Sequence, residues 1–249
     1  MIARATPFVA LGLLAVAGLG GCESTQSRSA ELEREGETAL VVDQGLKIKE
    51  ESSDVKVTSS TLLTDSYGSV VVVSLHNSSD RNLVNVPILI DVLDAKGKSV
   101  YRNDIPGIEP ALAAVPYIPA GGEAQWVNDQ VQTSGKPKSV MVKVGASSDS
   151  YSGPIPEIEV SKPTIEGDPV SGIEAKGTVV NRTGEDQERL LLYAIATSGG
   201  RVVAAGRGAL EHLKGTTKPL HYNIFFIGDP KGADVEVTQY PTLPGFEAG

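Results

Sequence analysis

The strongest constraint on the fold is an internal repeat in the part of the chain that follows Ser53. Residues 70–104 and 177–208 each contain a strand pattern, an Asn-x-Ser/Thr turn that begins at Asn77 or Asn181, a longer strand pattern and a glycine turn before another strand. Two further strand patterns follow each copy, at 119–129 and 139–144 in the first and at 214–226 and 234–239 in the second. A repeat of this length predicts two copies of one structural unit.

Apolar residues in these segments alternate with a period of two, the period of a β-strand whose side chains point to opposite faces. In the first copy the alternating set is Val84, Val86, Ile88, Ile90 and Val92. In the second copy Leu190, Leu192, Ala194 and Ala196 share one face, and Leu191, Tyr193 and Ile195 share the other. Turn signals recur about every 8–12 residues, a spacing typical of a β-sandwich.

The joint between the copies is residues 145–163, which are rich in Ser, Gly and Pro and indicate a domain boundary near Ser150. The chain has 249 residues, enough for one large domain or two small ones. We therefore expect an all-β protein with two tandem immunoglobulin-like β-sandwich domains, at 52–149 and 150–249.

The second copy resembles the bacterial FxLYD-type domain in three short stretches: Leu-Leu-Leu-Tyr-Ala at 190–194, Gly-Gly-Arg-Val-Val at 199–203 and Tyr-Asn-Ile-Phe-Phe at 222–226. The resemblance covers about residues 160–243, with Leu190 and Ala194 standing where the family has Phe and Asp. It implies a small immunoglobulin-like sandwich of the kind found in exported and lipid-anchored proteins, and it implies no catalytic residues.

The N-terminus has the layout of a secretory signal. Arg4 precedes an apolar run of 13 residues from Pro7 to Leu19, which is shorter than the roughly 20 residues of a membrane-spanning helix. The sequence Leu-Gly-Gly-Cys at 19–22 resembles the lipobox of bacterial lipoproteins. The resemblance implies that residues 1–21 are a signal peptide, cleaved between Gly21 and Cys22. The alternative is an ordinary secretory signal that happens to contain a cysteine.

In a lipoprotein the Cys22 thiol would carry a diacylglycerol, and a doubly acylated protein binds membranes stably because each buried methylene contributes about 0.8 kcal/mol. We therefore expect membrane lipid as a partner and a location on the extracytoplasmic face of the cell membrane. Residues 22–51 are rich in Ser and Glu and contain no aromatic residue, so we expect them to form a flexible, acidic tether.

Charge and motifs restrict the function. The net charge of −9 argues against nucleic acid as a partner, because phosphate binding needs a basic face. The sequence contains no nucleophile elbow, P-loop or His-Glu-x-x-His motif, so we predict neither an enzyme nor a cofactor. His212 and His221 could share a metal across a hairpin, but surface histidines are the simpler interpretation, and we predict no metal site.

The leading functional hypothesis is a non-catalytic protein-binding or spacing module that contacts an envelope protein through its edge strands and end loops. The alternative is an extracytoplasmic lipoprotein that binds a ligand or polysaccharide, with Trp126, Tyr101 and Tyr117 as a sugar platform. A core position for the tryptophan competes with that alternative, because large aromatic residues in sandwiches usually pack inward. Asn77 and Asn181 match the glycosylation pattern, but their equivalent places in the repeat favour a structural role in the turn.

Overall fold

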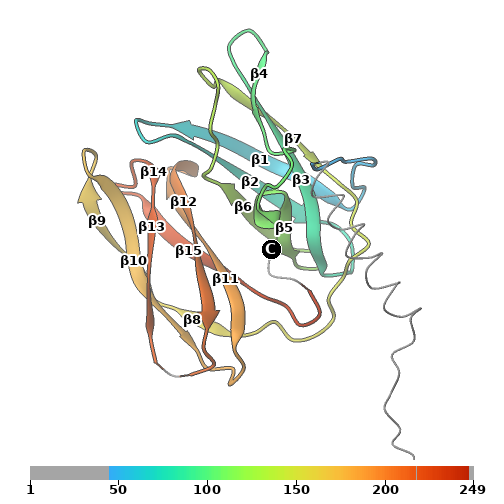
Figure 1. Cartoon of the computed structure of the whole chain (residues 1–249), viewed down its shortest axis with the longest axis vertical. Helices are drawn as coiled ribbons and strands as arrows, with labels where there is room; N and C mark the ends of the chain where they lie inside the picture. Colours follow the sequence, from blue (N-terminus) through green and yellow to red (C-terminus); the bar gives the residue numbers. More distant parts are fainter. Residues whose placement is uncertain (1–44, 217, 247–249) are drawn as a thin grey trace, which may run out of the picture. The chain divides into compact units, whose positions relative to one another are not determined.

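The computed structural model describes residues 45–216 and 218–246, so Cys22, the predicted signal peptide and most of the predicted tether lie outside the described residues. We call residues 45–150 the N-terminal half and residues 151–246 the C-terminal half. Within the described ranges the protein is all-β apart from one short 3-10 helix (Figure 1). No helix in these ranges is long and apolar enough to cross a bilayer.

The N-terminal half contains β1 (Val55–Thr64), β2 (Ser69–Asn77), β3 (Leu83–Leu93), β4 (Ser99–Arg102), η1 (Pro110–Leu112), β5 (Ala114–Ile118), β6 (Glu123–Asn128) and β7 (Ser139–Val144). The C-terminal half contains β8 (Ile158–Val160), β9 (Thr164–Asp168), β10 (Gly172–Asn181), β11 (Gln187–Ser198), β12 (Arg201–Leu213), β13 (Leu220–Phe225), β14 (Ile227–Gly228) and β15 (Asp234–Pro241).

Both halves pair their strands in the same order. In the N-terminal half β2 lies between β1 and β6, and β3 lies between β7 on one edge and β4 and β5 on the other. In the C-terminal half β10 lies between β8 and β9 on one edge and β13 on the other, and β11 lies between β12 and β15. All these pairings are antiparallel. The repeat seen in the sequence is therefore also a repeat of β-sandwich-like topology.

The two asparagine turns have the same geometry. The Asn77 side-chain oxygen accepts hydrogen bonds from the Ser79 backbone N–H at 3.0 Å and the Ser79 hydroxyl at 2.7 Å. Asn181 accepts the equivalent bonds from Thr183 at 3.1 Å and 2.7 Å. Each asparagine also donates to the carbonyl four residues on, at 2.7 Å and 2.8 Å. The predicted structural role is confirmed: a buried amide side chain closes the reversal between two strands.

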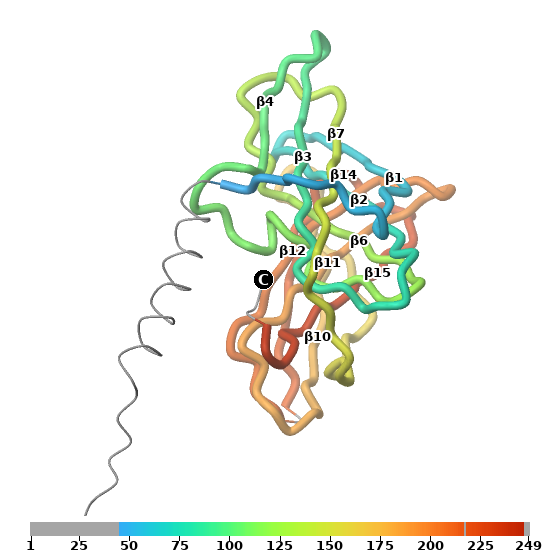
Figure 2. Tube along the Cα trace, turned by 90° about the vertical axis from the view of Figure 1, so that its right-hand side faces the viewer, coloured from blue at the N-terminus to red at the C-terminus, as the bar shows by residue number. Residues whose placement is uncertain are grey.

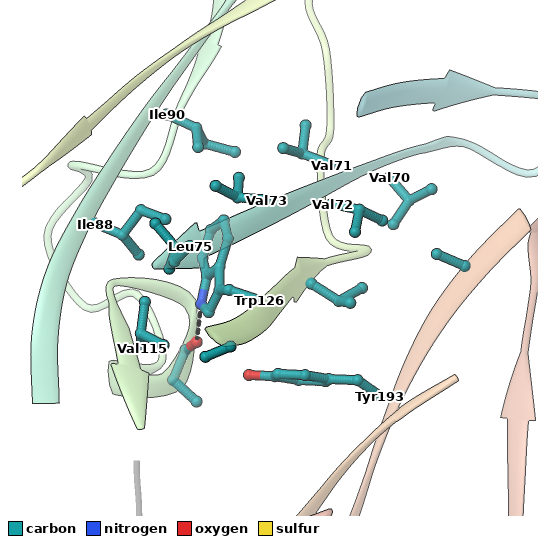
Figure 3. Packing of buried hydrophobic residues seen from close by; sticks show 14 of the residues in the cluster. Val70, Val71, Val72, Val73, Leu75, Ile88, Ile90, Val115, Trp126 and Tyr193 are labelled. Atoms are coloured by element: carbon teal, nitrogen blue, oxygen red, sulfur yellow. Dashed lines mark hydrogen bonds between the residues drawn. The ribbon is translucent and has the colours of Figure 1, made fainter. Parts of the chain in front are cut away.

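The core of the N-terminal half lies between β2 and β3. The alternating residues of β3 are all buried, as their period of two predicts: Val84, Val86, Ile88, Ile90 and Val92. Val73 of β2 is paired with Trp126 of β6, so these residues share a face of their sheet. Figure 3 shows Val71, Val73 and Leu75 gathered with Ile88, Ile90 and Trp126.

Strands β2 and β11 are buried on both faces. On β11 Leu190, Leu192, Ala194 and Ala196 belong to the core of the C-terminal half. The alternate residues Leu191, Tyr193 and Ile195 join the cluster that contains the N-terminal core. On β2 the residues that point away from Trp126 are Val70 and Val72, on the side of Tyr193 (Figure 3). The sheet of β1, β2 and β6 therefore packs on the sheet of β14, β12, β11 and β15, and one apolar cluster spans both halves.

Residues 45–51, the last part of the predicted tether, contact the N-terminal half at both of their ends. The Ser52 N–H donates to the Val144 carbonyl at 2.9 Å, and the Ala146 N–H donates to the Glu50 carbonyl at 3.1 Å. Gly45 is buried, and Leu46 is half-buried. The two bonds continue the pairing beyond the end of β7, and the burial of Gly45 shows that it packs against the N-terminal half.

Candidate functional site

Trp126, the residue on which the predicted sugar platform depended, lies in the core. Its side chain is fully buried, and its indole N–H donates to the Ala111 carbonyl at 2.9 Å. A ring with no exposed face cannot stack on a sugar, so this part of the ligand-binding hypothesis is wrong. The physical reason is the inward packing that large aromatic residues favour in sandwiches.

Tyr101 and Tyr117 are half-buried, and the structure does not bring them together. Tyr101 lines a hollow of about 380 Å³ with Ile105 and Gln132, whereas Tyr117 lines a separate hollow of about 230 Å³ with Tyr240. Burial raises the pKa of Tyr101, although the hydrogen bond from the Asn128 amide opposes this rise. The two tyrosines therefore belong to different surfaces.

A group of partly buried charged side chains lies between the two halves. Glu109, in the loop before η1, forms ion pairs with Arg189 of β11 and Arg207 of β12. One Glu109 oxygen, Oε2, accepts from Arg207 Nη1 at 3.1 Å, and Oε1 accepts from both arginines. The exposed fractions of the side chains are 5% for Arg207, 18% for Arg189 and 24% for Glu109. We call these three residues the interface ion cluster.

Strand register places the arginines of this cluster. Arg207 pairs with Tyr193 across the β11–β12 ladder, and Arg189 pairs with Glu211. Since Arg189, Leu191 and Tyr193 are alternate residues of one strand, they point to the same face. That face packs on the N-terminal half, so both guanidinium groups meet the loop that carries Glu109.

The electrostatics of the cluster favour the ionised forms. Burial alone would raise the pKa of Glu109, but the hydrogen bonds and charges of Arg207 and Arg189 outweigh it and lower the pKa. Burial disfavours the charged form of Arg207 and would lower its pKa, but the hydrogen bond and the charge of Glu109 outweigh burial, so the pKa of Arg207 is raised. Burial raises the pKa of Asp129, whose Oδ2 accepts the Arg207 backbone N–H at 3.0 Å. The cluster thus holds an anion between two cations and joins the halves.

Further polar contacts join the halves outside the cluster. The Tyr240 hydroxyl of β15 donates to the Gln125 carbonyl of β6 at 2.9 Å, and burial raises the pKa of Tyr240 to about 12. The β1–β2 hairpin lies beside β14 (Figure 2), where the Gly228 N–H donates to Asp65 Oδ2 at 2.8 Å. Hydrogen bonds at several places therefore surround the shared apolar cluster.

His212 is in β12 and His221 is in β13. Within residues 45–216 and 218–246 no group of three or more His, Cys, Asp or Glu side chains could hold a metal ion. In the acidic connection before β11, Asp186 accepts from the Lys214 ammonium at 2.6 Å and from the Gly215 N–H at 2.9 Å. These contacts explain this aspartate as part of a turn.

Sequence reasoning missed the interface ion cluster. Glu109 and its partners are 80 and 98 residues apart in the chain, and no local pattern links them. The available signal was that both faces of β11 are apolar in the sequence, which indicated that the face of Leu191, Tyr193 and Ile195 also packs against another part of the protein. No protein-family model matches the sequence, and no curated protein matches it. The resemblances to a lipoprotein signal and to the FxLYD-type domain therefore stay predictions.

Proposed function

We propose that the chain is a membrane-anchored envelope lipoprotein that acts as a non-catalytic protein-binding or spacing module. In this proposal Cys22 carries the acyl chains, and the two halves are tandem immunoglobulin-like domains. The observation that supports it best is the joint between the halves, where apolar residues of β2 and β11 form one cluster and Glu109 pairs with two arginines. A joint of this kind suits a spacer, because it holds two modules in a fixed relation.

A protein partner would need accessible backbone groups, and β9 offers them. The five residues of β9 are all exposed, and the strand pairs with β10 at the edge of its sheet. Edge strands bind extended peptides by adding a strand to the sheet. Ile165, which is 40% exposed on β9, would supply an apolar contact beside those hydrogen bonds.

The anchor is tested by mass spectrometry of the membrane fraction. We expect a diacylated Cys22 at the N-terminus of the mature chain, and we expect the Cys22→Ser variant to leave the membrane fraction. An unmodified Cys22, or a variant that stays bound to the membrane, would contradict the anchor.

The partner is tested by photo-crosslinking in cells with the full chain. A photoreactive residue at Ile165 should capture a discrete envelope protein, whereas the same residue at Met141, which is 53% exposed on β7, serves as the matched control. Equal capture from both positions would argue against β9 as the binding edge. If neither position captures a discrete protein, the protein-binding role is rejected and the spacing role remains. With Trp126 buried, no observation favours a second function based on that residue.

A further inference from the structure

A polar cleft lies at the end of the N-terminal half, where a hairpin tip meets the connection between two sheets. One wall is the tip of the β1–β2 hairpin, residues 64–69, and the other is the β6–β7 connection, residues 129–137. The cleft has a volume of about 640 Å³, which falls within the range of about 300–1,000 Å³ for sites that hold small ligands.

Hydrogen bonds fix both walls of the cleft. Asp65 accepts from the Tyr67 N–H at 2.7 Å and, through its other oxygen, from the Gly228 N–H of β14 at 2.8 Å. In the opposite wall Asp129 accepts from the Arg207 N–H of β12, and the Ser134 N–H donates to the Val100 carbonyl at 2.9 Å. The cleft is therefore shaped in advance by the packing of the two halves, which reduces the entropy lost when a ligand binds.

The aromatic side chain of Tyr67 lines the cleft, and hydrogen bonds hold it in place. Tyr67 is 53% exposed, and its hydroxyl donates to the carbonyls of Pro169 and Val170 in the β9–β10 turn. A tyrosine held at both its backbone and its hydroxyl offers a rigid amphipathic surface at little entropic cost. Such a ring suits a ligand that has an apolar face and polar edges.

Four polar side chains of the cleft lining have no hydrogen-bond partner among the described residues. The side chains of Ser66, Gln130, Gln132 and Thr133 line the cleft and form no hydrogen bond with residues 45–216 and 218–246. The carboxylates of Asp65 and Asp129 already accept backbone N–H groups, and Lys136 is the basic residue of the lining. Amides and hydroxyls that both donate and accept match a ligand rich in hydroxyl groups.

We propose that this cleft binds a neutral carbohydrate, with a sugar ring stacked on Tyr67 and its hydroxyls bonded to Gln130, Gln132 and Thr133. The net charge of −9 disfavours a polyanionic glycan. The site differs from the platform predicted around Trp126. It does not depend on the proposed protein contact, because carbohydrate binding can be measured with the purified protein.

The test is isothermal titration calorimetry on the full chain in detergent, with cellohexaose, maltohexaose and chitohexaose as probes. We expect saturable binding of at least one of them, weakened about tenfold or more by Tyr67→Ala through the loss of stacking. Gln132→Ala should weaken it about threefold to tenfold by removing a hydrogen bond. Tyr67→Phe keeps the ring and should weaken binding less than Tyr67→Ala.

Phe225→Ala is the matched control, because Phe225 is 55% exposed on β13 and does not line the cleft; it should bind as the unchanged protein does. Thermal unfolding of each variant separates a loss of binding from a loss of fold, and Gln132→Ala tests the site if Tyr67→Ala unfolds. The proposal is overturned if none of the probes binds, if the control loses binding as much as Tyr67→Ala, or if both cleft variants bind normally. Capture of a peptide in place of any glycan would also overturn it.

Discussion

Replacing Glu109 by Gln tests whether the interface ion cluster stabilises the joint between the halves. The substitution keeps the size of the side chain and removes its charge. Arg207, with a side chain only 5% exposed, would then lose the carboxylate that neutralises it. A buried charge left without its partner is strongly destabilising, typically by about 3–5 kcal/mol.

Two features of the structure place the effect at or below the low end of that range. Glu109 is 24% exposed, so water partly replaces its contribution. Asp129 remains close to Arg207 and continues to accept its backbone N–H. We therefore expect a loss of about 2–3 kcal/mol in the free energy of unfolding. For a domain of this size that corresponds to a fall of about 5–10 °C in the thermal midpoint.

The measurement is differential scanning calorimetry of the full chain and of Glu109→Gln at neutral pH. Glu211→Gln is the matched control, because Glu211 pairs with Arg189 at 3.1 Å but is 54% exposed. An exposed pair contributes about 0–1 kcal/mol, so the control should shift the midpoint by less than about 3 °C. Equal shifts in the two variants, or no shift in Glu109→Gln, would refute the assignment of Glu109 as the residue that joins the halves.

Three further predictions concern the core, the turns and pH. Trp126→Phe should cost about 1–3 kcal/mol in urea unfolding, because the Ala111 carbonyl loses its donor; an unchanged midpoint would contradict the buried indole. Asn77→Ala and Asn181→Ala should each cost about 2 kcal/mol, and a neutral result in one alone would contradict the equivalence of the turns. The pKa of Glu109 is lowered in the folded state, so ionised Glu109 stabilises the folded protein at pH values above its unfolded pKa of about 4.3. The midpoint difference between the unchanged protein and Glu109→Gln should therefore shrink as pH falls below that value; a constant difference would contradict it.

Local patterns predicted the strands because the period of two is a property of each segment alone. The buried set of β3 from Val84 to Val92 follows from alternation, and the equivalence of Asn77 and Asn181 follows from the repeat. Composition alone did not show that Gly45 is buried, or that Glu50 accepts a backbone hydrogen bond from Ala146 beyond the end of β7.

Contacts between the halves could not be predicted from the sequence. The pattern of β11 showed a second apolar face with Tyr193 at its centre, but the sheet that packs on it, β1, β2 and β6, is far away in the chain. The pairing of Glu109 with Arg207 has the same origin, since it exists only once the halves have packed. The cleft beside Tyr67 likewise lies between two segments that are far apart in the chain, residues 64–69 and 129–137.

The central claim is that the two halves form one body through the shared apolar cluster and the interface ion cluster. Backbone ¹⁵N relaxation of the full chain in detergent tests it most directly, because two modules on a loose joint tumble separately. We predict one rotational diffusion tensor that fits the strands of both halves. Two different correlation times, one for β1 to β7 and one for β8 to β15, would contradict the claim.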